Sequence, residues 1–409
     1  MAALPILVLN SGSSSVKFSV WNAEGSERKK LLEGEVEGIG AAKDEEAKFW
    51  IDSWIDSLLD ATSSRRIVEE KPEVADIAAA FALIANALKK PPFPKPGAVG
   101  HRMVCGGPTV TENQRVTPEL IDEMVKYTNF APLHTPAETY IMRQMLQEFP
   151  DTSNFVCLDS RFHRDLPEVT RSLPIPADYR VMGVRRFGAH GLSYESIVAH
   201  LQPDVPSRLI VAHLGNGASV AAIRDGKSVD ISMGLTPTGG IISGSRTGDI
   251  DPGVLLFLLR ELAKSKTATA DAADALEMIV NKKSGLAGVS GLTNDMRDLR
   301  EAIARGDQAA RLAVDQFTYV IRKFIGAYIA VLDGLDMLVF TGGIGEHDSA
   351  TRAEVCAGLE SLGILLDPEL NQLHGEAKIS ASCSPVTVLV IPAAEDLMIV
   401  NHVCGLLEN

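Results

Sequence analysis

The sequence has few aromatic residues, few cysteines and no long apolar run, and each of these absences excludes a class of protein. Of 409 residues, 5% are aromatic, whereas 45% are hydrophobic and 22% are charged, which is the composition of a globular protein. No apolar run reaches the roughly 18 residues that a membrane-spanning helix needs. Residues 1–9 lack the basic start of a signal peptide. We therefore expect a cytoplasmic protein that does not contact a membrane.

The cysteines and the basic residues are scattered along the chain. The five cysteines include no Cys-x-x-Cys pair, so we expect reduced thiols and no zinc site. The net charge is −14 and no block of lysine and arginine stands out, which excludes the basic surface of a nucleic-acid-binding protein. An anionic ligand must therefore be bound by cations that the fold places locally.

The length of the chain predicts two domains, because a single hydrophobic core rarely serves 409 residues. We place the boundary at residue 150, which gives an N-terminal domain of residues 1–150 and a C-terminal domain of residues 151–393. A last helix is predicted over about residues 394–407. We expect the segment 394–409 to pack back on the first domain.

Residues 7–20, LVLNSGSSSVKFSV, place a turn of glycine and serine between two apolar runs. Val16, Phe18 and Val20 recur with a period of two, which predicts a strand after the turn. A Walker A loop leads into a helix and ends in Gly-Lys-Ser or Gly-Lys-Thr, so this turn is not a Walker A loop. It is either an ordinary hairpin turn or a cradle whose backbone N–H groups and serine hydroxyls bind phosphate.

Two later segments strengthen the phosphate interpretation. Residues 209–233, LIVAHLGNGASVAAIRDGKSVDISM, repeat the order of strand, small-residue turn and strand, and Asp225-Gly226 predicts a further tight turn. Residues 337–349, MLVFTGGIGEHDS, lead from a buried strand through glycines into a helix. The repeat predicts a duplicated α/β fold of two domains with a nucleotide in the cleft between them.

Local patterns predict further helices and strands. Apolar residues at helical spacing indicate these helices. At Thr117 a cap residue is followed by proline and acidic residues, which also indicates the start of a helix. The predicted helices are residues 44–62, 74–90, 117–127 and a segment that ends near Phe149. The predicted strands include residues 98–104 and 154–159.

Single arginines and histidines in small-residue segments are candidates for chemistry. Arg102 and Arg246 each stand among glycines, a setting that suits bidentate binding of carboxylate or phosphate, although a solvated surface arginine is the common alternative. His134 and His190 have no partner at metal-ligand spacing. Each is therefore either a structural loop histidine or a site residue.

Three carboxylates and two asparagines complete the candidates. Asp159 ends a predicted strand, and Glu395 and Asp396 begin a predicted helix, where acids also stabilise the helix N-terminus. Mg²⁺ usually takes one or two protein oxygens beside phosphates and water, so a single acid suffices. Asn10 and Asn216, one in each small-residue turn, either hold an Asx turn or face phosphate or metal.

Taken together, these segments resemble the acetate kinase family. The resemblance rests on segments that follow one another from residue 7 to residue 346, with IPAAEDL near the end: LNSGSSSVKFSV, GHRMVCGG, APLHTP, GVRRFGAHG, HLGNGAS, SGSRTGDIDP, NKKSGLAGVSGLTNDMRDL and FTGGIGE. It implies the fold shared by acetate and sugar kinases, heat-shock 70 proteins and actin, with two ribonuclease H-like domains, each a mixed sheet flanked by helices. It also implies reversible transfer of the γ-phosphoryl group of ATP to acetate, giving acetyl phosphate and ADP.

The resemblance assigns roles to residues of this chain. The metal ion, Mg²⁺ or Mn²⁺, is expected at Asn10 and Glu395. The phosphates are expected at Ser13, Ser15 and Lys17 in the first hairpin and at His213, Gly215, Asn216 and Gly217 in the second. The catalytic set is Arg102, Arg246, His190, His134 and Asp159. The adenosine is expected at Asp295, Met296, Arg297, Gly343, Ile344 and Gly345, and the acceptor at Arg102, Val104, Leu133, Ala189 and Pro237.

Elementary chemistry agrees with these roles. A carboxylate is already ionised at pH 7, so the nucleophile needs no general base. The site must instead overcome the repulsion between two anions, which positioned cations around the phosphoryl group achieve. We therefore assign Asp159 an orienting role and His190 a role in stabilising the phosphoryl group during transfer. The resemblance further implies a homodimer.

Several residues depart from the family's usual pattern: Cys105, Thr135, Ala189, Tyr194, His347 and Ala393-Ala394. Ala189 stands where a phenylalanine usually walls the pocket for the acceptor's methyl group, and Tyr194 stands where a histidine is usual. A smaller side chain leaves room for an extra methylene, worth ~0.8 kcal/mol when buried. The alternatives are therefore a propionate or butyrate kinase on the same scaffold and, in another class, a nucleotide-binding sensor without catalysis.

Overall fold

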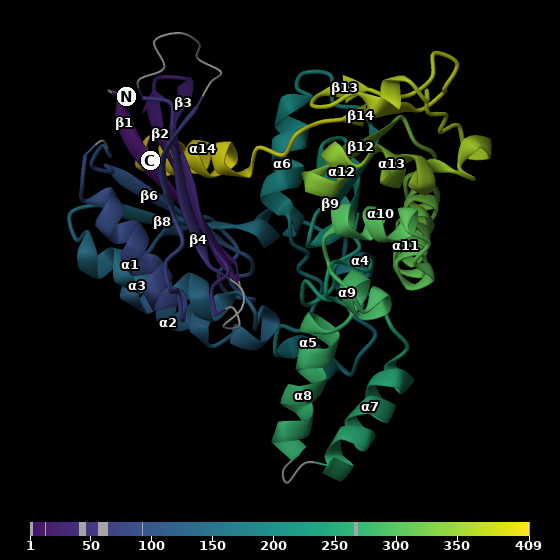
Figure 1. Ribbon diagram of the computed structural model, residues 1–409, viewed down its shortest axis with the longest axis horizontal. Helices are drawn as coiled ribbons and strands as arrows, with labels where there is room; N and C mark the ends of the chain where they lie inside the picture. Colours follow the sequence, from purple (N-terminus) through teal and green to yellow (C-terminus); the bar gives the residue numbers. More distant parts are fainter. Residues whose placement is uncertain are drawn as a thin grey trace. The chain divides into compact units, whose positions relative to one another are not determined.

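The structure is a computed structural model that describes residues 3–12, 14–40, 46–55, 64–91, 93–265 and 269–408. The chain forms two compact units, shown in Figure 1. Unit 1 comprises Met1–Arg161 and Ala394–Asn409, and unit 2 comprises Phe162–Ala393. Among the described residues, none of the helices combines the length and the apolar character that crossing a membrane requires.

Unit 1 is built on an eight-stranded sheet in the order β5-β4-β3-β2-β1-β6-β8-β7. Its strands are β1 (Leu4–Ser11), β2 (Ser15–Glu24), β3 (Glu27–Glu37), β4 (Lys48–Ser53), β5 (Arg65–Glu70), β6 (Ala98–Met103), β7 (Gln114–Arg115) and β8 (Ser153–Leu158). β1 pairs antiparallel with β2 and parallel with β6, and β6 pairs parallel with β8. The first glycine-serine turn therefore joins two strands, as predicted, and the alternating residues Val16, Phe18 and Val20 are buried.

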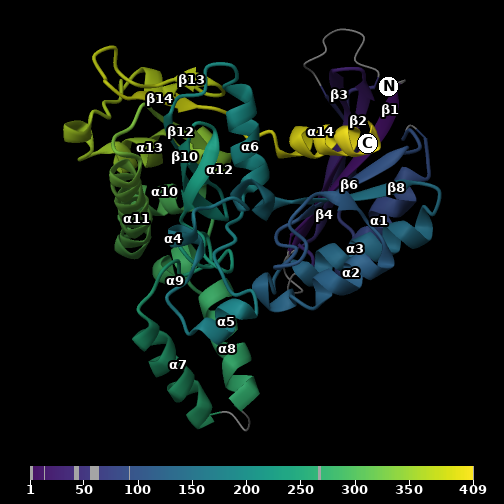
Figure 2. The same ribbon diagram turned by 180° about the vertical axis from the view of Figure 1, so that it is seen from behind.

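Helices cover both faces of this sheet (Figures 1 and 2). They are α1 (Ile77–Leu88), α2 (Pro118–Val125), α3 (Thr135–Glu148) and α14 (Glu395–Glu408), with short 3₁₀ turns η1 (Thr128–Phe130) and η2 (Asp159–His163). On one face Val99 packs in a cluster with Ile84 of α1 and Met145 of α3. Gly100 points to the other face, because successive strand residues alternate, and there it lies against Ile399 of α14.

Unit 2 is built on a six-stranded sheet in the order β11-β10-β9-β12-β14-β13. Its strands are β9 (Arg208–Leu214), β10 (Ala218–Arg224), β11 (Lys227–Ile231), β12 (Met337–Thr341), β13 (Ala377–Lys378) and β14 (Thr387–Val390). Between β10 and β11, Asp225 and Gly226 have φ of 49° and 76°, the left-handed pair that a tight hairpin turn requires. The predicted turn at Asp225-Gly226 is thereby confirmed.

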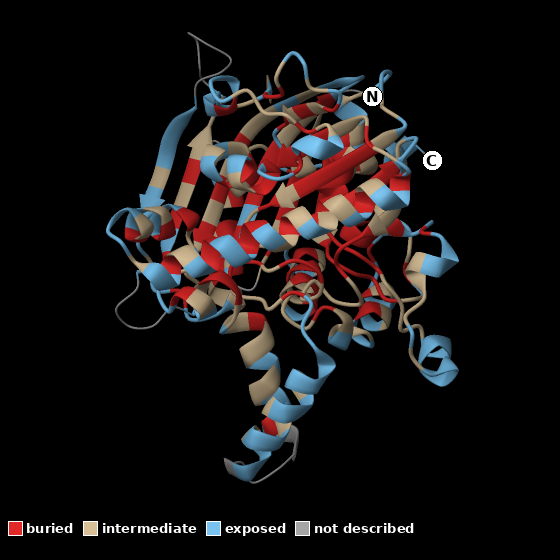
Figure 3. Cartoon of the chain, turned by 90° about the vertical axis from the view of Figure 1, so that its right-hand side faces the viewer, coloured by how far each residue is buried: buried red, intermediate tan, exposed pale blue. Residues whose placement is uncertain are grey.

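Ten helices are described in unit 2, and the longest is α11. They are α4 (Glu168–Arg171), α5 (Ala177–Val181), α6 (Gly191–His200), α7 (Pro252–Ser265), α8 (Thr269–Lys282), α9 (Gly285–Ser290), α10 (Met296–Ala304), α11 (Gln308–Leu332), α12 (Gly342–His347) and α13 (Ser349–Cys356), with 3₁₀ turns η3 (Glu360–Leu362) and η4 (Leu370–Gln372). Phe317 and Ile321 of α11 pack against Phe340 in the main core of this unit. In Figure 3 the hairpin of α7 and α8 is coloured mostly as exposed or intermediate.

The two sheets share one topology, which confirms the predicted duplication. The six strands β3-β2-β1-β6-β8-β7 of unit 1 correspond in order and direction to β11-β10-β9-β12-β14-β13 of unit 2. In each unit a small-residue turn joins the two antiparallel strands next to the parallel part of the sheet. Unit 1 adds β4 and β5 at its outer edge.

One predicted helix is wrong, and the predicted domain boundary differs from the observed one. Residues 48–53, inside the predicted helix 44–62, form β4, because Phe49 and Ile51 alternate as buried residues and pair with strands on both sides; residues 41–45 and 56–63 lie outside the described part. Residue 150 falls between α3 and β8, whereas β8 pairs with β6 and remains in unit 1, so the division lies after Arg161.

Candidate functional site

The carboxyl ends of the parallel strands in unit 1 bring three predicted site residues together. Asn10 lies near the end of β1, Arg102 near the end of β6, and Asp159 directly after β8. These strands are adjacent and parallel, so their ends meet at one edge of the sheet, where open α/β sheets place their ligands.

Arg102 is the centre of this group. Its Nη1 donates to Oδ1 of Asn10 at 3.1 Å, and its Nη2 is paired with Oδ2 of Asp159, which is fully buried. Nε of Arg102 is buried and has no hydrogen-bond partner among the described residues. Burial acts to lower the pKa of Arg102, but the charges of Asp159 and Glu395 outweigh it and the pKa stands above its ordinary value. Arg102 is therefore a fixed cation.

The first turn of α14 brings two acids to the same face of the sheet. Asp396 accepts a hydrogen bond from the Ser19 hydroxyl at 2.7 Å, and burial raises its pKa. Burial raises the pKa of Glu395 to about 7, opposed by Arg102 and reinforced by Asp159. A nearby cation would relieve this crowding of negative charge, and the oxygens of Asn10 and Glu395 are the hard ligands that Mg²⁺ prefers.

The first hairpin lies beside this group. Lys17 is the cross-strand partner of Asn10, so the two side chains share a face of the sheet. Nζ of Lys17 lies 3.9 Å from Glu35, and its side chain is 63% exposed, which leaves the ammonium accessible to an anion. Ser15 contacts Glu35 through a side-chain hydrogen bond, and Ser13 lies outside the described residues.

Glu138 on α3 is a buried acid beside Arg102 that the sequence analysis did not single out. Its Oε1 accepts a hydrogen bond from the Val104 backbone N–H at 3.0 Å, and its side chain is 2% exposed. Burial raises the pKa of Glu138 to about 8, against the opposing effects of Arg102 and of that N–H. The signal that would have found it is an acid at helical spacing from the apolar residues Ile141 and Met142, on the buried face of α3.

In unit 2 the start of α6 places His190 in a strained conformation. His190 has φ of 57°, in the left-handed region, and directly precedes the first residue of α6. Such a conformation costs a non-glycine residue about 1–3 kcal/mol and is concentrated at functional sites. Nδ1 of His190 is hydrogen-bonded to Oγ of Ser219 at 2.9 Å, and its ring stacks on that of His213 at 4.2 Å between centroids.

In the second hairpin, between β9 and β10, Gly217 lies close to the side chains of His190 and Arg246. A Cβ atom built at Gly217 would lie 3.2 Å from Nε2 of His190 and 3.5 Å from Nη1 of Arg246. Two nitrogen donors from separate segments thus converge on the space that this glycine leaves open. Backbone N–H groups of small-residue turns and two such side chains form a suitable site for a phosphoryl group.

The loop of Arg246 is held by the end of α8. Thr247 N–H donates to the carbonyl of Val280 at 3.1 Å, and Ser284 N–H donates to the carbonyl of Ser245 at 3.0 Å. Lys282, at the end of α8, has a pKa lowered by burial and then by the charge of Arg246. Two cations therefore lie near each other, and an anion between them would stabilise both.

A cavity of about 570 Å³ in unit 2 collects the predicted adenosine residues. Its walls include Asp295, Met296, Arg297, Gly343 and Ile344, together with Gly215, Asn216, Asn294, Arg300, His347 and Asp348. Asn216 is fixed there by Asn294, whose Nδ2 donates to its Oδ1 at 3.0 Å. Gly345, Gly217 and His213 do not line this cavity. The sequence analysis did not assign Asn294, Arg300 or Asp348, because their positions depend on how α10 packs against α13.

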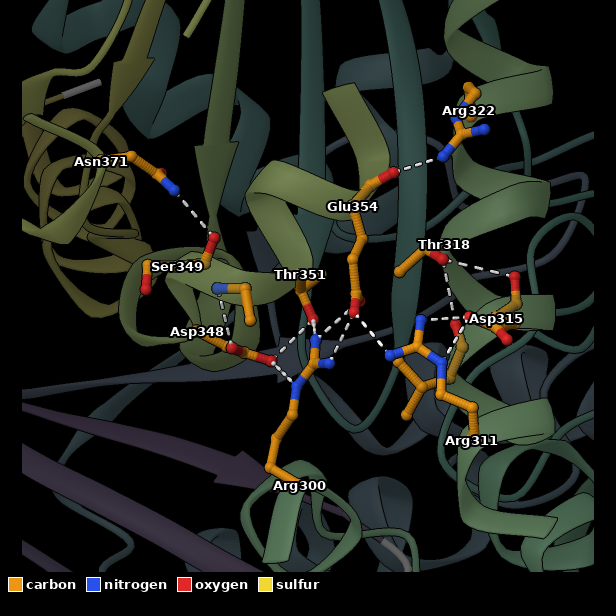
Figure 4. Close-up of polar contacts among 12 residues, drawn as sticks. Arg300, Arg311, Asp315, Thr318, Arg322, Asp348, Ser349, Thr351, Glu354 and Asn371 are labelled. Carbon is orange, nitrogen blue, oxygen red and sulfur yellow. Dashed lines mark hydrogen bonds and ion pairs between the residues drawn. The ribbon is translucent and has the colours of Figure 1, made fainter. Parts of the chain in front are cut away.

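Arg300, which lines this cavity, links α10 to α13, and Arg311 of α11 contacts the same glutamate, Glu354 (Figure 4). Its guanidinium donates to Asp348 at 3.0 Å and to both carboxylate oxygens of Glu354 at 2.9 Å, while Arg311 of α11 also donates to Glu354 at 3.1 Å. Burial acts to lower the pKa of Arg300, but Glu354 and Asp348 raise it above its ordinary value. This network fixes α10 against α13 and so preserves the shape of the cavity.

The remaining predicted residues are divided between the units. His134 caps the N-terminus of α3 without a side-chain capping bond. Of the expected acceptor residues, Val104 and Leu133 belong to unit 1, and Ala189 and Pro237 to unit 2. Ala189 is 2% exposed, and its carbonyl is hydrogen-bonded to His163 at 3.2 Å. The carbonyl of Pro237 accepts from Arg246 at 3.4 Å.

Comparison with known proteins gives matches along the whole chain. The profile of the acetokinase family matches residues 5–401. The acetate kinase of Phocaeicola vulgatus is 37% identical over an alignment that covers 99% of this chain and 100% of that protein. The crystal structure of the Porphyromonas gingivalis acetate kinase has a TM-score of 0.82 at 35% identity, covering 99% of this chain and 100% of that one. A propionate kinase from Francisella tularensis has a TM-score of 0.85 at 32% identity, covering 98% and 100%.

Proposed function

The chain belongs to the acetokinase family, and we propose that it transfers the γ-phosphoryl group of ATP to the carboxylate of acetate, giving acetyl phosphate and ADP reversibly. The observation that carries this proposal is the convergence of His190 Nε2 and Arg246 Nη1 on the open space at Gly217. Phosphoryl transfer moves a negatively charged group from ATP to a carboxylate, which is itself an anion. It therefore requires hydrogen-bond donors held in place around the transferred group.

The acceptor needs no general base, and the acids of unit 1 are suited to other tasks. Acetate is ionised at pH 7, so its oxygen attacks directly. Asp159 is paired with Arg102, so it orients and balances this arginine rather than taking a proton. Arg102 binds the acceptor carboxylate, which removes part of its repulsion from ATP.

The phosphoryl group is bound by the residues around the second hairpin. Arg246 and His190 donate to its oxygens, and Lys17 of the first hairpin is the residue of unit 1 that we expect to add positive charge to the phosphates. Asn10 and Glu395 would hold Mg²⁺ or Mn²⁺, which when bound supplies positive charge to the nucleotide phosphates. The nucleoside occupies the cavity lined by Asp295, Met296 and Gly343, which supports ATP and ADP as co-substrates.

A hydroxylamine-trapping assay tests this function directly. The protein is incubated with ATP, MgCl₂ and acetate, and acetyl phosphate is trapped as the hydroxamate while ADP is measured in parallel. We expect hydroxamate and ADP in equal amounts. ADP release without hydroxamate from acetate, propionate or butyrate would contradict the proposal and favour a nucleotide-binding sensor.

A propionate or butyrate kinase is the second candidate, and Ala189 favours it. The alanine side chain is a methyl group, so it does not fill the space that a phenylalanine ring would occupy at this position. A propionate kinase is among the solved structures that resemble this chain. One further buried methylene contributes ~0.8 kcal/mol, a few-fold in kcat/KM. The kcat/KM values for the three acids decide between the candidates, and a steep fall beyond acetate would exclude the second.

We also propose that the protein is a cytoplasmic homodimer. Exposed apolar side chains on unit 2, such as Leu256 and Phe257 of α7 and Met278 of α8, support an interface between two copies. The described cysteines are all free thiols, four of them buried, as suits a reducing compartment. Light scattering after size exclusion should give twice the mass of the chain; a monomer would contradict the dimer.

A further inference from the structure

Tyr194, one of the residues that depart from the family's usual pattern, contacts the serine to which His190 is hydrogen-bonded. The Tyr194 side chain is fully buried, and its hydroxyl lies 2.5 Å from Oγ of Ser219. The same Oγ lies 2.9 Å from Nδ1 of His190. Tyrosine, serine and histidine therefore form one chain of hydrogen bonds that ends at the imidazole.

The local fold brings these three side chains together. Tyr194 lies one helical turn after His190, and its N–H donates to the His190 carbonyl at 3.1 Å in the first turn of α6. Ser219 comes from β10, opposite His213 on β9. The Tyr194 ring packs edge-on against His163 at 5.6 Å between centroids. These contacts hold the phenol against Oγ of Ser219.

The chemistry of the three groups sets the direction of the protons. A serine hydroxyl has one proton, so it cannot donate to the phenol and to the imidazole at the same time. A phenol is a stronger donor and a poorer acceptor than an aliphatic alcohol, because its proton is more acidic. Donation from Tyr194 to Ser219 is therefore the favoured direction, and it leaves the Ser219 proton available to Nδ1 of His190. The neutral imidazole then carries its own proton on Nε2.

We propose that Tyr194 is a positioning residue that, through Ser219, holds the proton of neutral His190 on Nε2, the nitrogen that lies beside Arg246 at Gly217. The effect of this tautomer on catalysis rests on the proposed function, in which His190 donates through Nε2–H to the phosphoryl group. Nδ1 cannot serve in this way, since it is hydrogen-bonded to Ser219.

The test uses Tyr194→Phe, which removes the hydroxyl and keeps the ring. Nitrogen NMR of the free protein with labelled histidine reports which ring nitrogen carries the proton, and His190→Gln identifies the His190 signals among the nine histidines. We expect Nε2–H in the wild type and a mixture of both tautomers in Tyr194→Phe. We also expect kcat to fall about tenfold while KM for ATP changes less than twofold, a smaller loss than removal of a whole donor.

A double-mutant cycle separates positioning from a general structural effect. In a Ser219→Ala background, Tyr194→Phe should cause no further loss of kcat, because the two residues act through one chain. Tyr328→Phe, another buried tyrosine of unit 2, is the matched control and should leave the His190 signals unchanged. An unchanged tautomer in Tyr194→Phe, or additive losses in the cycle, overturns the proposal. The NMR measurement needs no turnover, so an inactive wild type with Nε2–H would contradict only the proposed function.

Discussion

Arg102 and His190, two central side chains of the candidate site, are held by hydrogen bonds to other protein groups. Arg102 is bound to Asn10 and Asp159, and His190 is bound to Ser219. A charge or donor fixed in a partly dry environment acts on a phosphoryl group more strongly than an exposed one, because less solvent must reorganise. Single substitutions there should therefore lower turnover.

Arg246→Leu should separate turnover from nucleotide binding. Arg246 lies at the second hairpin, whereas the proposed nucleotide cavity is lined by other residues. Loss of one positioned donor costs about 10²–10³-fold in kcat, while Kd for ADP should change less than threefold in calorimetry. Arg305→Leu, at the exposed end of α10, is the control. Equal losses of turnover and ADP binding would contradict the assigned role.

Glu138→Gln should change how stability depends on pH. The folded pKa is about 8 against an ordinary 4.5, so the folded protein keeps a proton that the unfolded chain loses. The stability that this proton contributes is fully present below pH 4.5 and is lost as the pH rises through about 8. Each pKa unit is worth about 1.4 kcal/mol.

Thermal unfolding of both proteins between pH 5 and pH 8 measures this effect. The wild type should lose a few kcal/mol relative to Glu138→Gln over this range, since glutamine does not titrate. Glu24→Gln, on the exposed end of β2, serves as the control and should follow the wild type. Parallel curves for the wild type and Glu138→Gln would show that Glu138 is ionised throughout.

Among the helices, α14 shows how an element far along the chain completes a site in unit 1. The helix carries Glu395 and Asp396 in its first turn and packs on the sheet where Gly100 leaves room for it. A Cβ atom at Gly100 would lie 2.3 Å from Cγ2 of Ile399. The position of Glu395 therefore depends on the absence of a side chain on β6.

Gly100→Ala and Gly405→Ala form a matched pair that tests this dependence. At Gly100 the added methyl displaces α14, and overpacking of this kind costs about 1–3 kcal/mol. At Gly405, within α14, an added Cβ meets nothing within 4 Å, and alanine should stabilise the helix by about 0.5–1 kcal/mol. Denaturant unfolding should move the two variants in opposite directions, and only Gly100→Ala should lower kcat. A neutral Gly100→Ala would contradict this packing.

For the whole molecule, the residues that we propose for the acceptor carboxylate and the metal ion lie in another unit than the proposed nucleotide cavity. The residues that line the nucleotide cavity all belong to unit 2. Arg102, Asp159 and Glu395 all belong to unit 1. A substitution of Arg102 in unit 1 should therefore affect turnover without affecting nucleotide binding in unit 2.

Calorimetry with ADP tests this separation. Arg102→Leu should abolish acetyl phosphate formation and leave Kd for ADP within about twofold. Gly343→Leu should weaken ADP binding at least tenfold, because the new side chain enters the cavity from a position where a Cβ meets nothing within 4 Å, and a displaced ligand loses its contacts there. Loss of ADP binding in Arg102→Leu would contradict this separation.

Much of the fold followed from local patterns. The period of two at Val16, Phe18 and Val20 predicted β2, and the Thr117 cap predicted α2, whose Leu120 N–H donates to the Thr117 hydroxyl. The helix predicted over 44–62 failed, since pairing of β4 with β3 and β5 overrides local propensity. The site residues stay predictions, although the structure gathers five of the six expected adenosine residues around one cavity.

The sequence by itself determined the two small-residue hairpins, their duplication, the family and the types of residue at the site, because turn chemistry and strand periodicity are local properties. Only the tertiary structure decided which residues meet. Arg102 and Asp159 are 57 positions apart in the sequence, and Ser19 meets Asp396 across 377 positions. Burial, which raises the pKa of Glu138 and Glu395, and the hydrogen-bond chain from Tyr194 to His190 depend on packing between distant segments, which no local pattern records.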